Sequence, residues 1–460
     1  MGLEKRLSNL FAYFSVFLFA FVLFLYLIFN NYLFILLSFL IIFFISNNTN
    51  IKHFGLILFL LSFIIRLFII IFFNFPQVYD FATLLDASKM FSVGDYSFNK
   101  WWHFYTWGYQ TGFVIYQGLL LKLFHSEFLL KLFNVLYSSL LVLFVYKVSK
   151  RISNEKSARF VSLLYMIFPF YLFLNTVLVN SHLSSLLMYI GIIFLIKRVK
   201  SYEDYVFGGV FLALGNIIRP EGIIVVISFA LFEFFTLDRR KISQTLIRFV
   251  SFLIIYLSIG FVASSLVIKS GVNPSGLQNK DPLWKFILGF NYDTCGYYTD
   301  DDSKYQFDRK TEISIIKERA FGDLTRTGKL TLCKIDHFWL SSGLDMETVS
   351  FNDKSVNILG MDVNFSDISI IAISFNKCVH IFILFMFFLG IFVNRKRLSN
   401  EVLFLLIMCV ITFGVFLFIE IQPRYAYFIH VSLFILSSLG INVLYGLLDR
   451  INFKSLKKVL

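Results

Sequence analysis

Apolar runs of about 20 residues recur along almost the whole chain, and each is long enough to cross a membrane as a helix. The composition agrees, because 58% of the residues are hydrophobic, 61 are Phe and the mean hydropathy is +0.75. The runs are uniformly apolar and do not alternate with polar residues, which argues against a transmembrane β-barrel. The sequence therefore predicts an all-α polytopic membrane protein.

Twelve membrane spans fit this pattern. The first apolar run lacks a small-residue cleavage site, so it is expected to be a retained span and not a signal peptide. The expected spans are 11–29, 31–47, 54–74, 127–148, 157–174, 181–198, 205–218, 222–238, 246–268, 372–394, 400–419 and 424–447.

Lys and Arg concentrate in the short connections, such as "KVSKRISNEKSAR" (147–159), which places these connections and both termini in the cytoplasm. This topology accounts for the net charge of +13 without a nucleic-acid partner. Counting the short run 111–124 as a span would move 147–159 outside. We therefore expect 111–124 to be an interfacial or re-entrant helix on the outer face.

Two long polar segments then lie outside the membrane: the first loop, 75–126, and the cap, 269–371. The cap is expected to contain one or two amphipathic helices within 310–339. It also holds Cys295 and Cys333, whose pairing the sequence leaves open. The expected organisation is two N-terminal spans (1–53), a membrane core that includes the first loop (54–268), the cap (269–371) and C-terminal spans (372–460).

Several polar side chains fall in or beside the spans, where an ionisable group costs about 2.5–3.5 kcal/mol to insert. Each one alone could be a helix cap or a snorkelling side chain. Together they indicate a polar cavity that opens to the exterior. The residues are Arg66, Asp80, Asp86, Asn180, His182, Arg219, Glu221, Glu420 and Arg424.

The available chemistry is limited. The sequence has no Walker A, GxGxxG or HExxH motif, and its seven His are scattered. A donor that arrives from the membrane would be a lipid phosphate. Its transfer needs a carboxylate to deprotonate an acceptor hydroxyl and an Arg to bind phosphate oxygens, and both residue types occur at the same expected level.

The same segments carry a family resemblance. The chain resembles the C-type (GT-C) membrane glycosyltransferases, and in particular the bacterial branch related to protein O-mannosyltransferases and the lipid A aminoarabinose transferase. The resemblance extends over 54–447, with the first two spans as an addition. It rests on "PQVYDFATLLDASKMFSVGDY" (76–96), "TWGYQTGFVIYQGLLLKLF" (106–124), "NIIRPEGIIV" (216–225) and "QPRYAYFIHVSLFIL" (422–436).

The resemblance implies a polyprenyl-phosphate-linked sugar as donor and transfer, usually with inversion, to an acceptor on the outer face. The key Asp of the family corresponds to Asp80, which is favoured over Asp86 as the base because it lies closer to the end of the preceding helix. Arg424 is expected to contact the donor phosphate, with Tyr425 beside it. Arg219 is a weaker candidate for the same role.

Arg66 is also expected to bind the donor phosphate, because it lies in the span before Asp80. Many relatives have an acidic residue where this chain has "VNSH" (179–182). Whether a divalent metal binds is therefore left open, and no residue is assigned as its ligand. The aromatic segment "WWHFYTWGY" (101–109) is either a membrane-interface belt or a surface on which a sugar stacks. The expected acceptor or sugar-binding residues are His103, Trp107, Asn180 and His182.

The predicted function is a cell-membrane glycosyltransferase that acts on an envelope acceptor, either a cell-wall polysaccharide or a glycolipid. Two alternatives stay open. A glycan polymerase or ligase would rely on outer Arg and His groups. A transporter or flippase of lipid-linked sugars would show inverted repeats or discontinuous helices, for which the short pair 205–218 and 222–238 is a faint candidate.

Overall fold

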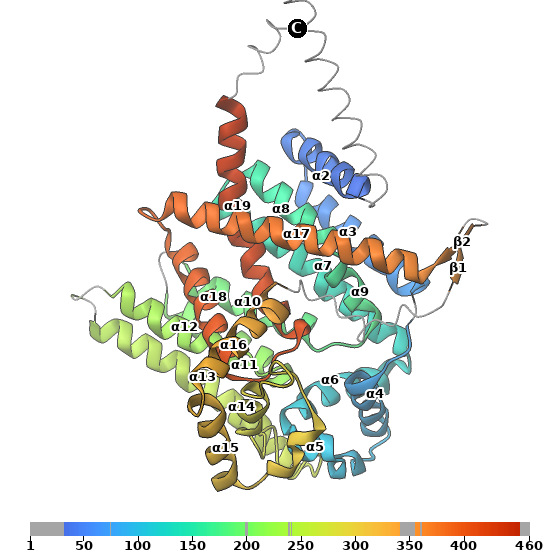
Figure 1. Ribbon diagram of the computed structural model, residues 1–460, viewed down its shortest axis with the longest axis vertical. Helices are drawn as coiled ribbons and strands as arrows, with labels where there is room; N and C mark the ends of the chain where they lie inside the picture. Colours follow the sequence, from blue (N-terminus) through green and yellow to red (C-terminus); the bar gives the residue numbers. More distant parts are fainter. Residues whose placement is uncertain are drawn as a thin grey trace, which may run out of the picture.

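The computed structural model describes residues 32–73, 75–197, 201–237, 240, 242–340, 355–358 and 361–450. Within these residues the protein is helical apart from one antiparallel hairpin, formed by β1 (Ser355–Ile358) and β2 (Met361–Asn364). The expected helical fold class is confirmed (Figure 1). The first expected span, 11–29, lies outside the described residues.

Six of the described helices are long and apolar enough to cross a membrane. They correspond to six of the twelve expected spans. A seventh, 157–174, is a pair of helices bent by 50°, α8 (Glu155–Ile167) and α9 (Pro169–Phe173). The six are α3 (Phe54–Phe72), α7 (Glu127–Ile152), α13 (Ile242–Lys269), α17 (Phe365–Asn394), α18 (Asn400–Phe418) and α19 (Tyr427–Arg450).

Four further expected spans are helices of 14 to 17 residues, shorter than the roughly 20 residues that a full crossing needs. The expectation of twelve full-length spans is therefore met only in part. Two of these helices stop at the polar turn Arg219–Glu221, which the site described below uses. The four are α2 (Tyr32–Asn47), α10 (Ser181–Leu195), α11 (Tyr202–Ile218) and α12 (Gly222–Phe235).

The helices pack closely where small residues allow it, as is usual in membrane bundles. The crossing of α17 and α19 is the clearest case. A Cβ added to Gly440 would lie 2.0 Å from the carbonyl oxygen of Met386, so only glycine fits at this contact.

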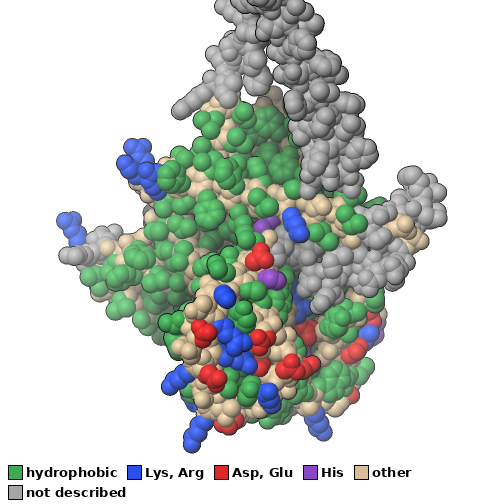
Figure 2. Space-filling model, in the orientation of Figure 1, with side chains coloured by type: hydrophobic (Ala, Val, Ile, Leu, Met, Phe, Trp, Pro, Cys, Tyr) green, Lys and Arg blue, Asp and Glu red, His purple; other side chains and the backbone are tan. Residues whose placement is uncertain are grey.

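Two kinds of connection join the helices. The short ones, at one set of helix ends, carry basic residues. The opposite helix ends lead into α4 (Tyr79–Ser92), α5 (Trp102–Thr106), α6 (Thr111–Phe124) and the cap. In Figure 1 these elements gather in the lower part of the molecule, and in Figure 2 most acidic side chains on the visible face lie there too. The expected interfacial helix 111–124 is α6, which packs on α4.

The cap contains α14 (Trp284–Gly289), α15 (Arg309–Phe321) and α16 (Leu324–Lys334), and the last two are the helices expected within 310–339. A disulfide joins Cys295 to Cys333, which answers the question that the sequence left open. The ammonium group of Lys334 donates to the carbonyl oxygens of Phe416, Leu417 and Ile419, at 3.3, 3.0 and 2.8 Å. It thereby satisfies the free carbonyls at the end of α18 and fixes the cap to the bundle.

A pair of buried carboxylates holds one turn of the cap. Asp281 and Glu312 are 2% and 3% exposed, and each accepts a hydrogen bond of 3.2 Å from the backbone N–H of Phe307. Burial, and then the neighbouring Asp281, raise the pKa of Glu312 to about 7. The pair therefore shares a proton at acidic pH.

The stability of the cap is expected to depend on pH through Glu312. In the unfolded chain this carboxyl ionises near pH 4.5, whereas the folded protein keeps the proton up to about pH 7. Stability should therefore fall as pH rises from about 4.5 to 7 and level off above that. Glu312→Gln should flatten this dependence, which thermal unfolding of both proteins across the interval will show. Parallel pH curves for the two proteins would contradict the assignment.

Candidate active site

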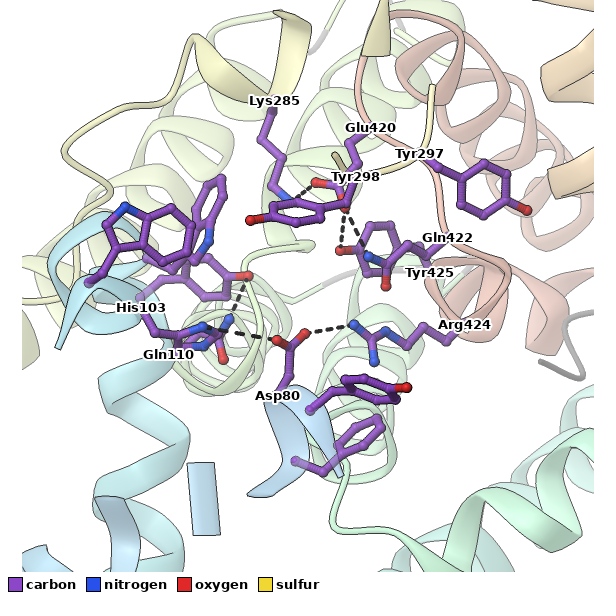
Figure 3. A pocket seen from close by; sticks show the side chains of 15 residues that line it. Asp80, His103, Gln110, Lys285, Tyr297, Tyr298, Glu420, Gln422, Arg424 and Tyr425 are labelled. Carbon is purple, nitrogen blue, oxygen red and sulfur yellow. Dashed lines mark hydrogen bonds and ion pairs between the residues drawn. The ribbon is translucent and has the colours of Figure 1, made fainter. Parts of the chain in front are cut away.

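A cavity of about 420 Å³ lies where the first loop, the cap and the segment that leads into α19 meet (Figure 3). Acidic, basic and aromatic side chains all line it. Its lining residues are Tyr79, Asp80, Phe81, Trp102, His103, Trp107, Tyr109, Gln110, Lys285, Tyr297, Tyr298, Glu420, Gln422, Arg424 and Tyr425.

Asp80 and Arg424 form an ion pair in this cavity. Asp80 lies in the first turn of α4, where the helix dipole favours a negative charge. Arg424 lies in the 3-10 turn Pro423–Ala426 that precedes α19, and its NH2 donates to Asp80 Oδ2 at 2.7 Å. Tyr79 has a φ of 51°, a conformation that a large side chain rarely adopts, so the backbone beside Asp80 is strained.

His103 stands on the other side of the carboxylate. Its Nδ1 lies 4.0 Å from Asp80 Oδ1, and its Nε2 is buried without a hydrogen-bond partner among the described residues. Figure 3 shows Asp80 between His103 and Arg424, with its carboxylate pointing into the cavity. The sequence-predicted Asp80, His103 and Arg424 are therefore brought together.

A second ion pair, between half-buried Lys285 and buried Glu420, lies in the wall of the cavity. Glu420 also accepts hydrogen bonds from Gln422 Nε2 at 3.0 Å and from the Tyr425 hydroxyl at 3.3 Å. Burial by itself lowers the pKa of Lys285, but the charge of Glu420 outweighs burial and raises that pKa above its usual value. The ammonium group therefore stays charged, 4.4 Å from the centre of the Trp107 ring.

Arg219 supplies a third ion pair, in a side pocket of about 40 Å³ that shares Asp80, Arg424 and Tyr425 with the cavity. Its Nε donates to Glu221 Oε1 at 2.6 Å, and its NH1 donates to Asn180 Oδ1 at 3.0 Å. Arg219 and Asn180 are thus held next to the cavity as one hydrogen-bonded unit.

Three cations surround the ring of Tyr425. Arg219, Lys285 and Arg424 lie 5.1, 5.4 and 5.9 Å from its centre. Each is bonded to its own carboxylate, but those carboxylates differ in access to solvent. The side chain of Asp80 is 43% exposed, whereas those of Glu221 and Glu420 are 12% and 2% exposed. The Asp80–Arg424 pair is therefore the one that a ligand can reach and separate.

Three sequence-predicted residues line neither cavity nor side pocket: Arg66, Asp86 and His182. Arg66 faces the interior of the bundle, fully buried, and its NH1 donates to Ser62 Oγ at 2.6 Å. His182 is also fully buried and bonds through Nδ1 to the Tyr427 hydroxyl at 2.6 Å. Asp86 is exposed six residues after Asp80, which places it about 240° around the helix.

Sequence reasoning noted Glu420 beside Arg424 but missed its partner Lys285 as part of the site. Glu420 precedes the "QPRY" segment, and its place at a helix end was the available signal. Lys285 lies in the cap segment "DPLWKF", which resembles members of the same branch but assigns this lysine no role, so only the folded structure brings it to the cavity.

A divalent metal does not fit the cavity as it is built. The carboxylates that line it are Asp80 and Glu420, and each is already bonded to a protein cation. Among the described residues, the one group of three close His, Cys, Asp or Glu side chains is Cys295, Cys333 and His337, and its two sulfurs form the disulfide. We derive no step that needs a metal.

The Lys285–Glu420 pair is expected to matter strongly for stability. Lys285→Met leaves a buried carboxylate without its cation, which should lower the free energy of unfolding by about 3–5 kcal/mol. The double variant Lys285→Met/Glu420→Gln removes both charges and should recover most of that loss. Thermal unfolding of the two variants and the wild type in detergent tests this. A double variant no more stable than the single one would contradict the role of the pair.

Comparisons with known proteins bear on the family resemblance and the fold. Residues 112–263 match the family model described as dolichyl-phosphate-mannose-protein mannosyltransferase. This match covers α6 to α13, with Asn180 and Arg219, but neither Asp80 nor Arg424. No curated protein sequence matches the chain significantly.

The fold is similar to that of the archaeal oligosaccharyltransferase AglB from Archaeoglobus fulgidus, solved with an inhibitory peptide and a dolichol-phosphate. The TM-score is 0.50 at 13% sequence identity, and the similarity covers 89% of this chain and 52% of the other. The apo form of the A. fulgidus oligosaccharyltransferase gives the same values. This chain thus spans about half the length of the solved structures it matches. The expected resemblance to C-type membrane glycosyltransferases is confirmed.

Proposed function

We propose that this membrane glycosyltransferase moves a sugar from a polyprenyl-phosphate-linked donor to an envelope acceptor, a cell-wall polysaccharide or a glycolipid. The observation that carries the proposal is the accessible Asp80–Arg424 pair in the cavity. Two findings support the donor class. The matching family model is named for a dolichyl-phosphate sugar, and the archaeal relative was solved with dolichol-phosphate.

In the proposed step Asp80 is the general base and Arg424 binds the donor phosphate. The acceptor hydroxyl gives its proton to Asp80 while its oxygen attacks the anomeric carbon of the sugar. The bond between that carbon and the phosphate oxygen breaks, and its electron pair leaves with the polyprenyl phosphate. Arg424 stabilises the charge that develops on this leaving group, because a guanidinium group can donate two parallel hydrogen bonds to phosphate.

The ion pair that forms without donor determines the order in which the donor and the acceptor can engage the site. Without donor, Asp80 is bonded to Arg424 and both groups are neutralised. A donor phosphate competes for the guanidinium group, so its binding releases the carboxylate to accept a proton. We infer that the donor binds before the base becomes available to the acceptor.

The helix ends support an extracytoplasmic cavity. The opposite helix ends and the short connections there hold Lys150, Arg151, Arg395 and Lys396, which the positive-inside rule assigns to the cytoplasm. The Cys295–Cys333 disulfide of the cap also suits an oxidising compartment.

Envelope-glycan composition tests the function directly. Mass spectrometry of glycans from the wild type, a deletion strain and the complemented deletion should show one sugar substituent that disappears and returns. An unchanged glycan in the deletion strain would contradict transfer to an envelope acceptor. A shorter polymer of unchanged composition would instead indicate a polymerase.

A further inference from the structure

An aromatic strip leads out of the cavity across the surface. It consists of Trp102, Tyr105 and Phe307, which are 44%, 43% and 48% exposed. Trp102 lines the cavity, and Tyr105 follows it by three residues on α5, so the two side chains are neighbours on the helix. The rings of Tyr105 and Phe307 lie 5.5 Å apart, so the strip extends from the cavity as far as Phe307.

The strip is built on a rigid support. Fully buried Trp284 stacks on Trp107 with ring centres 5.3 Å apart and an angle of 11°. Trp102 packs edge-on against the same Trp284 at 5.5 Å. A Cβ added to Gly108 would lie 2.3 Å from the carbonyl oxygen of Gln278, so the first loop and the cap touch directly beneath the strip.

The exposed position of Phe307 comes at an energetic cost. Its φ is 65°, a left-handed conformation that is unusual for a large side chain. The buried Asp281 and Glu312 hold its backbone N–H in that conformation. Strained backbone of this kind persists only where the surrounding structure holds it in place. It is found mainly at active sites and ligand-binding sites.

One cation completes the strip. The exposed Lys280 places its ammonium group 3.7 Å from the centre of the Tyr105 ring. The strip therefore offers flat apolar faces together with a hydroxyl group and a mobile hydrogen-bond donor at their edges.

We propose that this strip binds the acceptor, and that the acceptor is an extended saccharide chain. The proposal rests on the proposed transferase function and names its acceptor class. Sugar rings present apolar C–H faces rimmed by hydroxyl groups, which match aromatic faces edged by polar groups. The chain would lie along Phe307 and Tyr105, and its end would pass Trp102 to reach Asp80.

The other classes of acceptor fit less well. A lipid surface would be met by aliphatic residues and Phe, which are the most exposed apolar side chains of the long helices, as at Ile64, Phe261 and Phe388. The strip differs because it also contains Trp, Tyr and Lys. A peptide acceptor commonly adds a strand to a sheet edge. In the described part of the cap the strands are β1 and β2, and neither contributes a residue to the strip.

Binding of envelope fractions to the purified full-length protein in nanodiscs tests the strip. The saccharide probe is polysaccharide released from the deletion strain, freed of protein and lipid, because that strain should accumulate unmodified acceptor. The test variant is Tyr105→Ala/Phe307→Asn, in which Asn tolerates the left-handed backbone. The matched control is Phe321→Ala, which removes a phenyl ring that is exposed on α15 of the same cap.

The expected result is at least a tenfold rise in Kd for the double variant and an unchanged Kd for the control. Wild-type protein that ignores the polysaccharide would overturn the proposal, as would a double variant that binds it equally well. The protein fraction and vesicles of host lipids are the other probes. If the double variant lost binding only to the protein fraction, the strip would be a peptide site instead. If it lost binding only to the vesicles, the strip would belong to the membrane interface instead. The glycan composition of the deletion strain tests the transferase function itself. Failure of that function can therefore be distinguished from failure of the acceptor proposal.

Discussion

Asp80→Asn is expected to reduce sugar transfer by a factor of about 10²–10⁴, the usual contribution of a general base. An amide has nearly the shape of the carboxylate but cannot take the acceptor proton. The variant should accumulate in the membrane like the wild type, because Asp80 is partly exposed and a surface ion pair contributes about 1 kcal/mol or less. Complementation of the deletion strain, followed by mass spectrometry of its glycans, measures the effect.

The matched control is Asp86→Asn, on the same helix. Asp86 is exposed and lines neither the cavity nor the side pocket, so this change should leave transfer within about twofold of the wild type. If Asp80→Asn restores the glycan fully while Asp86→Asn does not, the assignment of the base is wrong.

Arg424→Lys is expected to lower kcat/KM for the donor about 10- to 100-fold, since a charged hydrogen bond contributes about 1.5–3 kcal/mol. Lysine keeps the charge but cannot bind phosphate through two parallel hydrogen bonds. The KM for the acceptor should change little, because Arg424 is proposed to contact only the donor. Initial rates in isolated membranes, with donor and acceptor varied separately, distinguish the two effects.

Arg326→Lys is the matched control for that change. Arg326 pairs with Asp293 at 2.9 Å on the exposed surface of the cap, away from the cavity. Its substitution should leave both KM values unchanged. An acceptor KM that rises as much as the donor KM in Arg424→Lys would contradict a phosphate-binding role.

The membrane fold could be predicted from sequence because its main requirement is local: each span must be apolar over its own length. That reasoning located α3, α7, α13, α17, α18 and α19. Of the twelve expected spans, six are described helices long enough to cross a membrane. Apolar composition alone does not show where a helix bends, as between α8 and α9.

The site was predictable only where a residue had a local reason to be noticed. Asp80 and Arg424 are charged groups at helix ends, and the structure places them 2.7 Å apart. In the sequence, Arg66 and His182 looked like equally good site candidates, yet both are buried inside the helix bundle. Which face of a helix meets the cavity depends on packing against other helices, and that information is not local.

The Asp80–Arg424 contact joins residues separated by 344 positions. During synthesis the carboxylate, the first loop and the cap are all made before the arginine that completes the cavity. A chain interrupted at the end of α18 would contain Asp80 and its aromatic neighbours but would lack Arg424 and Tyr425. Under the proposed mechanism such an intermediate lacks the group that binds the donor phosphate, so a nascent chain would not consume lipid-linked sugar until Arg424 has been added.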